Sequence, residues 1–401
     1  MISLEQALEQ ILKLVLPVVS ESVPLSEADR RILAEPVRSP IDLPPFDNSA
    51  MDGYAVRAAD IASARSDAPV QLRRCGRVAA GETYTGTVAL GTCVRLFTGS
   101  ILPGGADAVV MQEDTQVPPN GPDEVLVLDA VKPWENVRLR GEDVRAGAVL
   151  VEAGVRLNPM NMSLLAATGL SSVRAGQQPV VGILATGSEL RDSGQPLVPG
   201  QIYESNRLGV AALVRRAGGI PKIFPLVPDA LAATKQALTK AFDECDAVIT
   251  SGGVSVGEMD FIKQAFDEAG GTLKFWKVAI KPGRPFVFGS CRGKLLFGLP
   301  GNPVSALVTF LLLVRPALLR WQGASNVALP AYPAILAEPL ANPGSRRHFL
   351  RVKLDAQGKV RSAGVQASHI LSASAAADGL VDLPPDGALE AGASVHVLRW
   401  D

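Results

Sequence analysis

Strand-like apolar runs alternate with helix-like segments between residues 178 and 326, and this alternation restricts the fold more than any other feature of the chain. The runs "PVVGILA", "PKIFPLV" and "DAVIT" have the apolar character of buried strands, and helix-like segments separate them. Strands that alternate with helices of roughly 10–15 residues favour a parallel sheet with helices on both faces. We therefore expect a doubly wound, mostly parallel sheet in this part of the chain.

The segments around this sheet differ from it, which indicates an α/β protein of several domains. Residues 46–136 carry short apolar runs broken by Gly and Pro, which predicts a small inserted β domain. Residues 1–44 and 138–176 are helix-rich, and we expect them to form one discontinuous domain that the β domain interrupts. After the α/β domain of residues 178–326, residues 327–401 again show short apolar runs between Pro and Gly, which predicts a C-terminal all-β domain.

Capping patterns and hydrophobic periodicity predict three helices outside this alternation or at its end. Ser3 and Gln6 have the spacing of a capping box before an apolar helical face. Asn158 and Pro159 fit the N-cap and first position of a second helix. The apolar run 304–314 spans only 11 residues, whereas a bilayer requires about 20. We therefore predict a buried helix there and no membrane association.

Charge balance and cysteine content limit the classes of partner and the cellular compartment that we expect for this protein. The chain has 39 Lys and Arg against 40 Asp and Glu, so its net charge of -1 gives no reason to expect nucleic acid. The four cysteines are far apart and form no CxxC pair, which argues against a disulfide framework and a zinc knuckle and fits a reducing cytoplasm. Acids near the N-terminus argue against a signal peptide.

Three loops that follow predicted strands are rich in glycine and hydroxyl side chains. They are residues 185–190, 250–260 and 298–306. In an open parallel sheet, ligands bind beyond the carboxyl ends of the strands, and glycines such as Gly252 and Gly253 let the backbone approach a phosphate. Glycines also make ordinary tight turns, but three such loops at one edge favour a phosphate site. Hydroxyl groups that could cap a helix or bind phosphate belong to Thr186, Ser188, Ser251 and Ser255.

Three carboxylates and a group of cations lie at this same edge. Glu189, Asp229 and Asp260 each follow a predicted strand, and they would repel a phosphate unless a hard cation lay between them, which points to Mg²⁺. Asp229 and Asp260 also directly precede helices, so an N-cap role is the alternative for each. The cations in "FWKVAIKPGRPF" are Lys277, Lys281 and Arg284. We expect its lysines to leave a buried strand at its end and face an anion.

Prolines restrict the third loop, and the histidines receive no function. Pro300 and Pro303 fix a loop in which Asn302 can bind a ligand or its own backbone. The histidines are His348, His369 and His396, and all lie outside the α/β domain. Isolated histidines more often pack than bind a ligand, so we assign them no role.

Several long motifs together resemble one known family. They are "DNSAMDGYAVR", "RLFTGS", "RGEDV", "TGSEL", "SGGVSVGEMDF", "FWKVAIKPGRPF" and "GLPGNPVSA". In this order they are similar to the molybdopterin molybdenumtransferases, whose bacterial members are called MoeA and which include the E domain of gephyrin. The resemblance covers nearly the whole chain, and its motifs are far longer than a lone glycine pattern.

The resemblance implies an activity and an assembly. Adenylylated molybdopterin and molybdate would react to molybdenum cofactor and AMP with a divalent cation, and the subunits would form a four-domain homodimer in which the N-terminal domains of one subunit face the α/β domain of the other. Further partners that we expect are the molybdopterin adenylyltransferase and molybdoenzyme chaperones.

The resemblance also assigns residues. The acids of the family fall on Asp52, Asp143, Glu189, Asp229 and Asp260. The basic residues, rigid-loop prolines and hydroxyls fall on Arg138, Lys277, Lys281, Arg346, Pro300, Pro303, Thr98 and Ser368. Without the resemblance, the clusters around Asp52 and Arg138 read as surface turns. Arg284 stands where the family usually has lysine, so the charge is kept while the geometry changes.

Two other functions fit parts of the pattern. A non-catalytic scaffold like gephyrin would not need the acids and lysines, and this chain lacks a long Pro/Ser-rich linker. A molybdopterin adenylyltransferase, or a relative that acts on pyridine nucleotides, would have a similar α/β domain, but residues 1–176 and 327–401 argue against both. Adenylylation of molybdopterin by ATP would reveal the adenylyltransferase.

Overall fold

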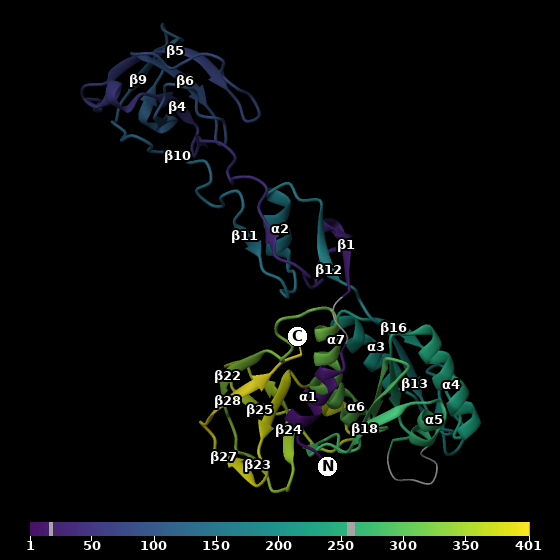
Figure 1. The fold of residues 1–401 in the computed structure, drawn as a ribbon. Coiled ribbons are helices and arrows are strands. Elements are labelled where there is room, and N and C mark those ends of the chain that lie inside the picture. The colour runs from purple at the N-terminus through teal and green to yellow at the C-terminus, as the bar shows by residue number, and fades with distance from the viewer. Residues whose placement is uncertain (16–18, 255–260, 401) are drawn as a thin grey trace. The chain divides into compact units, whose positions relative to one another are not determined.

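The computed structural model describes residues 1–15, 19–254 and 261–400, and these form two compact units. The large unit comprises residues 1–35, 153–157 and 172–401, and the small unit comprises residues 36–152 and 158–171. Each unit is described here by itself (Figure 1). The finer division into four domains remains a prediction. Ser255 and Asp260 lie outside the described residues.

A six-stranded mixed sheet forms the centre of the large unit, as the alternating pattern predicts. Its first four strands are parallel, and the last two are added antiparallel at one edge. In spatial order the strands are β16 (Ile220–Ile223), β13 (Val180–Ala185), β17 (Ala247–Ser251), β21 (Lys294–Leu299), β20 (Val287–Cys291) and β18 (Thr272–Trp276). Strand β20 follows the turn "KPGRP" and is not evident from the alternation, because it belongs to a hairpin rather than to a strand–helix unit.

The apolar run "LKFWKVAI", which we expected to be one strand, is divided between two sheets. Strand β18 ends at Trp276, and Lys277 has a positive φ of 75° that interrupts the extended backbone. Strand β19 (Ile280–Lys281) then pairs in parallel with β24 (Arg347–Leu354) of a second sheet. The pairing aligns Lys281 with His348, so it carries the lysine from the first sheet to the second.

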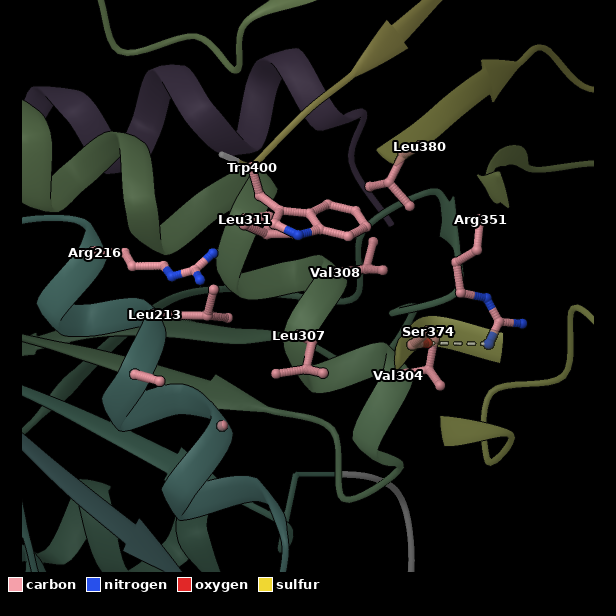
Figure 2. Close-up of a pocket in the computed structure, with 12 residues that line it drawn as sticks. Leu213, Arg216, Val304, Leu307, Val308, Leu311, Arg351, Ser374, Leu380 and Trp400 are labelled. Atoms are coloured by element: carbon pink, nitrogen blue, oxygen red, sulfur yellow. Dashed lines mark hydrogen bonds between the residues drawn. The ribbon is translucent and has the colours of Figure 1, made fainter. Parts of the chain in front are cut away.

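The second sheet is built mainly from the C-terminal residues, as predicted, but this segment is β-rich rather than all-β, because it also contains helix α8 (Leu371–Ala375). Its strands are β19, β24, β26 (Gly379–Leu383), β28 (Ser394–Leu398) and β22 (Ala331–Ile335), with β25 (Val360–Ser362) paired to β24. An apolar pocket of about 260 Å³ lies where this part of the large unit meets the helices, and Leu307, Leu380 and Trp400 contribute to its wall (Figure 2).

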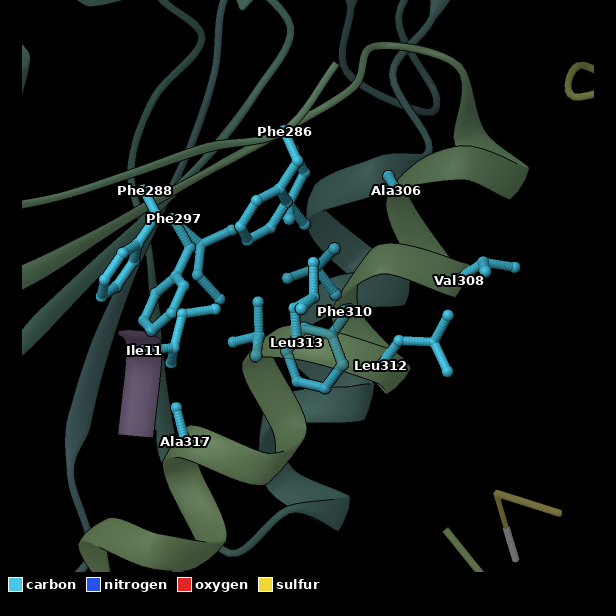
Figure 3. Close-up of a cluster of buried hydrophobic side chains, with 14 of the residues drawn as sticks. Ile11, Phe286, Phe288, Phe297, Ala306, Val308, Phe310, Leu312, Leu313 and Ala317 are labelled. Carbon is cyan, nitrogen blue, oxygen red and sulfur yellow. The ribbon is translucent and has the colours of Figure 1, made fainter. Parts of the chain in front are cut away.

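Helices cover both faces of the first sheet, as expected for a doubly wound fold. One face packs against α1 (Leu4–Lys13), α3 (Asn206–Arg216) and the helix that begins at Pro303, and the aromatic rings of Phe286, Phe288 and Phe297 fill this core (Figure 3). The other face packs against α4 (Leu231–Glu244) and α5 (Ile262–Glu268). The capping box of Ser3 and Gln6 at the start of α1 is present.

The long apolar helix is a core element, as predicted, although it extends beyond the apolar run 304–314 at both ends. It consists of α6 (Pro303–Thr309), a π-helical turn (Phe310–Val314) and α7 (Arg315–Trp321). Residues Pro303–Trp321 are long and apolar enough to cross a membrane by composition, but 78% of the apolar window is buried inside the protein.

The small unit holds the inserted β segment. Its six-stranded sheet has the order β7 (Ala108–Met111), β4 (Gly53–Val56), β6 (Thr92–Leu96), β5 (Val70–Val78), β9 (Glu124–Val127) and β8 (Thr115–Gln116). Two short pairs and one helix complete it: β3 (Asn48–Ser49) with β10 (Val137–Arg138), β2 (Val37–Arg38) with β11 (Val149–Val151), and α2 (Pro159–Ala167). Asn158 caps α2 with Pro159 at its start, as predicted.

Candidate functional site

An acidic cavity of about 670 Å³ lies at the carboxyl ends of the parallel strands. Residues from the loops after β13, β16, β17 and β21 line it, because the ends of adjacent parallel strands meet at the same edge of the sheet. The predicted site residues that it brings together are Glu189, Asp229, Gly252, Gly253, Pro300, Asn302 and Pro303. The three glycine-rich loops therefore form one wall, as their shared position in the sequence pattern suggested.

Asp229 is fixed by a reciprocal contact with Ser188. The Ser188 backbone N–H donates to Oδ2 of Asp229 at 3.0 Å, and the Asp229 N–H donates to Oγ of Ser188 at 3.1 Å. The N-cap of α4 is Ala230, without a side-chain capping bond. The alternative N-cap role of Asp229 is therefore wrong: its carboxylate binds a neighbouring loop and lines the cavity.

The glycine loop lies tightly against Thr186. A Cβ atom on Gly252 would meet the Thr186 carbonyl oxygen at 2.7 Å, and one on Gly253 would meet the Thr186 hydroxyl at 2.9 Å. Both glycines also have positive φ. Within the described part of the chain, the buried Thr186 hydroxyl has no hydrogen-bond partner, and Thr186 is one of the residues that line the cavity. Such a group is a candidate ligand-binding atom.

Asn206 joins two of the loops and was not predicted as a site residue. Its side chain is 9% exposed, and its Nδ2 donates to Oγ of Ser251 at 2.7 Å and to the Gly301 carbonyl at 2.8 Å. Asn206 is the first residue of α3 and lines the cavity. The sequence "ESNRLG" predicted only the start of a helix. The signal that could have identified Asn206 was the pair of polar residues, Ser and Asn, before an apolar helical face.

A basic cavity of about 580 Å³ adjoins the acidic one. Lys281, Arg284 and Arg346 supply its positive charge, and Ser368 lies in its wall. The Arg346 guanidinium donates to the Ile280 carbonyl at 2.9 Å; partial burial, and secondarily the charge of Arg284, lowers its pKa below the ordinary value. The two cavities share the wall residues Pro285, Pro300, Asn302 and His369.

Lys277 is not one of the described residues that line these two cavities. Its ammonium group lies 3.7 Å from the centre of the Trp276 ring, and that of Lys263 lies 3.5 Å from it. The indole N–H of Trp276 donates to the Val254 carbonyl at 3.2 Å, so this cluster contacts the glycine loop through its backbone.

The small unit holds four further residues that the resemblance assigns. Oδ1 of Asp52 accepts hydrogen bonds from the backbone N–H and from the hydroxyl of Thr98, both at 2.8 Å. These two bonds lower the pKa of Asp52. Arg138 lies in β10, and the backbone N–H of Asp143 donates to the Leu43 carbonyl at 3.1 Å. The structure thus brings Asp52 and Thr98 together.

The acidic cavity offers oxygen donors of the kind that a hard cation prefers. Among the residues that the structure describes, no group of three or more His, Cys, Asp or Glu side chains could hold a metal ion. Two carboxylates, Glu189 and Asp229, nevertheless line the same cavity as the unpaired hydroxyl of Thr186. Oxygen donors of this kind suit Mg²⁺ rather than zinc.

Three family models match consecutive parts of the chain. They are the MoeA N-terminal region (domain I and II) over residues 2–169, a probable molybdopterin binding domain over residues 182–320, and the MoeA C-terminal region (domain IV) over residues 333–400.

Curated relatives and solved structures agree with these models. The molybdopterin molybdenumtransferase of Haemophilus influenzae is 39% identical, with 99% of this chain and 98% of the relative covered. Molybdopterin molybdenumtransferase 2 of Mycobacterium tuberculosis is 40% identical, with 95% and 94% covered. A crystal structure of the MoeA protein of Pyrococcus horikoshii matches with a TM-score of 0.86 and 33% identity over 100% of both chains. The chain therefore belongs to the molybdopterin molybdenumtransferase (MoeA) family.

Proposed function

We propose that the two adjoining cavities are the site at which this transferase of molybdenum cofactor biosynthesis moves molybdenum from molybdate to adenylylated molybdopterin, with release of AMP. One observation carries the proposal: a cavity lined by carboxylates and a cavity lined by cations share a wall at the carboxyl ends of the parallel strands. Substrates that combine a phosphate linkage with a separate oxyanion need these two environments next to each other.

The acidic cavity suits the phosphate linkage of the adenylylated substrate. The glycine loop lets its backbone come close to a ligand, since Gly252 and Gly253 have no Cβ that would fill the space beside Thr186. The hydroxyl of Thr186 is available as a donor. Asn206 holds Ser251 and Gly301 in place, so the loops are organised before the substrate arrives.

We propose Mg²⁺ as the cation that lets phosphates and carboxylates share this cavity. Glu189 and Asp229 would hold it, with Thr186 nearby and with Asp260, which lies outside the described residues, as a further ligand. When bound, the ion would neutralise charge on the phosphate oxygens. The reciprocal bond to Ser188 orients one oxygen of Asp229.

The basic cavity suits molybdate and the charge of the departing phosphate. Lys281 and Arg284 lie on opposite sides of the turn formed by Pro282 and Gly283, and Arg346 approaches from the second sheet. Three cations in one cavity favour a doubly charged oxyanion and stabilise negative charge that develops beside it. Arg284 keeps the charge that a lysine would give and adds a planar, bidentate group.

The assembly and compartment are also proposals. We infer a homodimer in which Asp52, Thr98, Arg138 and Asp143 of the small unit serve the site of the second subunit. We expect the protein to act in the cytoplasm and to exchange molybdopterin with an adenylyltransferase and with molybdoenzyme chaperones. Sedimentation equilibrium would test the dimer, and a monomer at micromolar concentration would contradict it.

Anaerobic incubation with adenylylated molybdopterin, molybdate and Mg²⁺ tests the function through the release of AMP. Lys281→Ala should lower kcat/KM about 100-fold, because one charge contact to the transition state contributes about 3 kcal/mol. Lys274→Ala is the control, since Lys274 is an exposed lysine on β18 of the same unit. Unchanged turnover in Lys281→Ala, or AMP formation without molybdate incorporation in the wild type, would contradict the assignment.

A further inference from the structure

His369 lies on the wall that separates the acidic cavity from the basic one. Four residues line both cavities, and His369 is the ionisable member of this group. The two prolines, Pro285 and Pro300, offer no polar side-chain atom, and Nδ2 of Asn302 already donates to Oγ of Ser368 at 3.2 Å. A ligand that extends from one cavity into the other would therefore meet the imidazole.

The loop that carries His369 is held from one side by a buried arginine. Arg351, on β24, is 2% exposed, and its guanidinium donates five hydrogen bonds to the segment 365–374, one of which Figure 2 shows. Burial lowers its pKa, and neutral acceptors take up its five N–H groups. The acceptors are Oε1 of Gln366, the carbonyls of Val365, Ala367 and Ile370, and Oγ of Ser374.

The same loop is held from the other side by the proline-restricted loop. The Val304 N–H donates to the Ser368 carbonyl at 3.3 Å, and Asn302 binds the Ser368 hydroxyl. His369 thus follows a residue bound to the first sheet's loop and precedes Ile370, whose carbonyl is bound to Arg351. A backbone fixed on both sides presents its side chain at a defined place.

The imidazole itself makes no hydrogen bond within the described part of the chain, and the side chain is exposed. His348, by contrast, is buried in β24, and His396 is exposed on β28 away from both cavities. The carboxylates of Glu189 and Asp229 line one neighbouring cavity, and the cations Lys281, Arg284 and Arg346 line the other. The ring nitrogens are therefore free to bind a ligand in either cavity.

We propose that His369 is a substrate-contacting residue, and that its imidazole N–H donates a hydrogen bond to a tetrahedral oxyanion where the two cavities meet. The oxyanion is either a phosphate of the adenylylated substrate or molybdate, since both present the same kind of acceptor. This inference rests on the proposed function of the two cavities and adds a residue to it.

The variants His369→Ala and His369→Gln test the inference in steady-state assays of AMP release. Loss of a hydrogen bond to a charged group should raise one KM about 10- to 100-fold in His369→Ala. His369→Gln keeps an N–H donor and should recover at least half of this change on a logarithmic scale. The substrate whose KM rises identifies the oxyanion: adenylylated molybdopterin for phosphate, or molybdate itself. His396→Gln is the matched control and should equal the wild type.

The thermal midpoint separates a substrate contact from a structural role. We expect His369→Ala to melt within about 1 °C of the wild type, because an exposed side chain without a hydrogen bond contributes little to stability. Wild-type KM values for both substrates in His369→Ala would overturn the inference, and so would equal losses in the Ala and Gln variants. Absence of AMP release by the wild-type protein would instead contradict the proposed function, so the two failures are distinguishable.

Discussion

At the scale of single residues, the site depends on side chains that organise loops as much as on those that would touch a substrate. Asn206 connects the end of β17 to the loop before α6 with one amide group. Ser188 and Asp229 bind each other through their backbones and side chains. These contacts join residues that are close in the fold but far apart in the sequence, so local sequence patterns do not reveal them.

Replacing Asn206 by alanine should loosen the two loops that it joins. The buried Ser251 hydroxyl and the Gly301 carbonyl would lose this partner, which should lower the free energy of unfolding by about 1–3 kcal/mol. Misplaced loops should also reduce kcat/KM about tenfold or more. Urea unfolding and AMP release measure the two effects. Asn326→Ala removes an exposed amide that caps a turn at Ala328, and it should change neither quantity appreciably. Wild-type behaviour of Asn206→Ala would contradict the account.

Stability should fall in mild acid because of His348. The side chain is 4% exposed, and burial, then the charges of Lys281, Arg351 and Arg346, lowers its pKa to about 4. The unfolded chain takes up this proton near pH 6.5, so unfolding is favoured as the pH falls from about 6.5 towards 4. The full difference amounts to about 3 kcal/mol. This pH-dependent loss of stability is absent above about pH 7, where His348 is neutral in both the folded and the unfolded chain.

Urea unfolding between pH 7.5 and pH 5 measures this dependence. His348→Gln should lose stability less steeply than the wild type over this range, because glutamine does not ionise. His396→Gln keeps the buried histidine and should retain the wild-type slope. Parallel curves for His348→Gln and the wild type would show that His348 does not cause the acid sensitivity.

At the scale of elements, the site is made where regular structure ends. Strand β18 ends at Trp276, and the positive φ of Lys277 sends the chain into the second sheet as β19. Lys281 reaches the basic cavity through this change of sheet. The apolar residues on both sides of Lys277 have the same character, so the sequence predicted a strand but not the sheet to which each half belongs.

Gly252→Ala should lower stability and activity more than the replacement of a glycine that has a positive φ but no close neighbours. Its Cβ would meet the Thr186 carbonyl at 2.7 Å, whereas Gly270, with a similar φ of 83°, has nothing within 4 Å. Gly270→Ala should therefore cost only the backbone strain, about 1 kcal/mol. Gly252→Ala should cost more than this and lower kcat/KM by about 100-fold, because the loop must shift from the cavity. Equal effects of the two substitutions on unfolding and AMP release would contradict the role of close packing.

At the scale of the whole molecule, the sequence predicted the architecture better than the site. Periodicity and capping predicted the doubly wound sheet, the helix at Ser3, the helix at Asn158 and the buried apolar helix, because these depend on local patterns. The sequence also predicted that Glu189 and Asp229 lie at one site, and both line the acidic cavity. The position of His369 beside the basic cavity was not predicted, although the resemblance assigned its neighbour Ser368, because it depends on how the C-terminal sheet packs beside the strand ends.

The central claim is that the acidic and basic cavities form one site for two anionic substrates. Anomalous diffraction at the molybdenum edge, from crystals of the wild-type protein with molybdate and an adenylylated molybdopterin analogue, tests it most directly. The account predicts a molybdenum peak in the basic cavity, beside Lys281, Arg284 and Arg346, with the phosphates of the analogue against Gly252 and Gly253. A molybdenum peak or phosphate density away from these two cavities would contradict it.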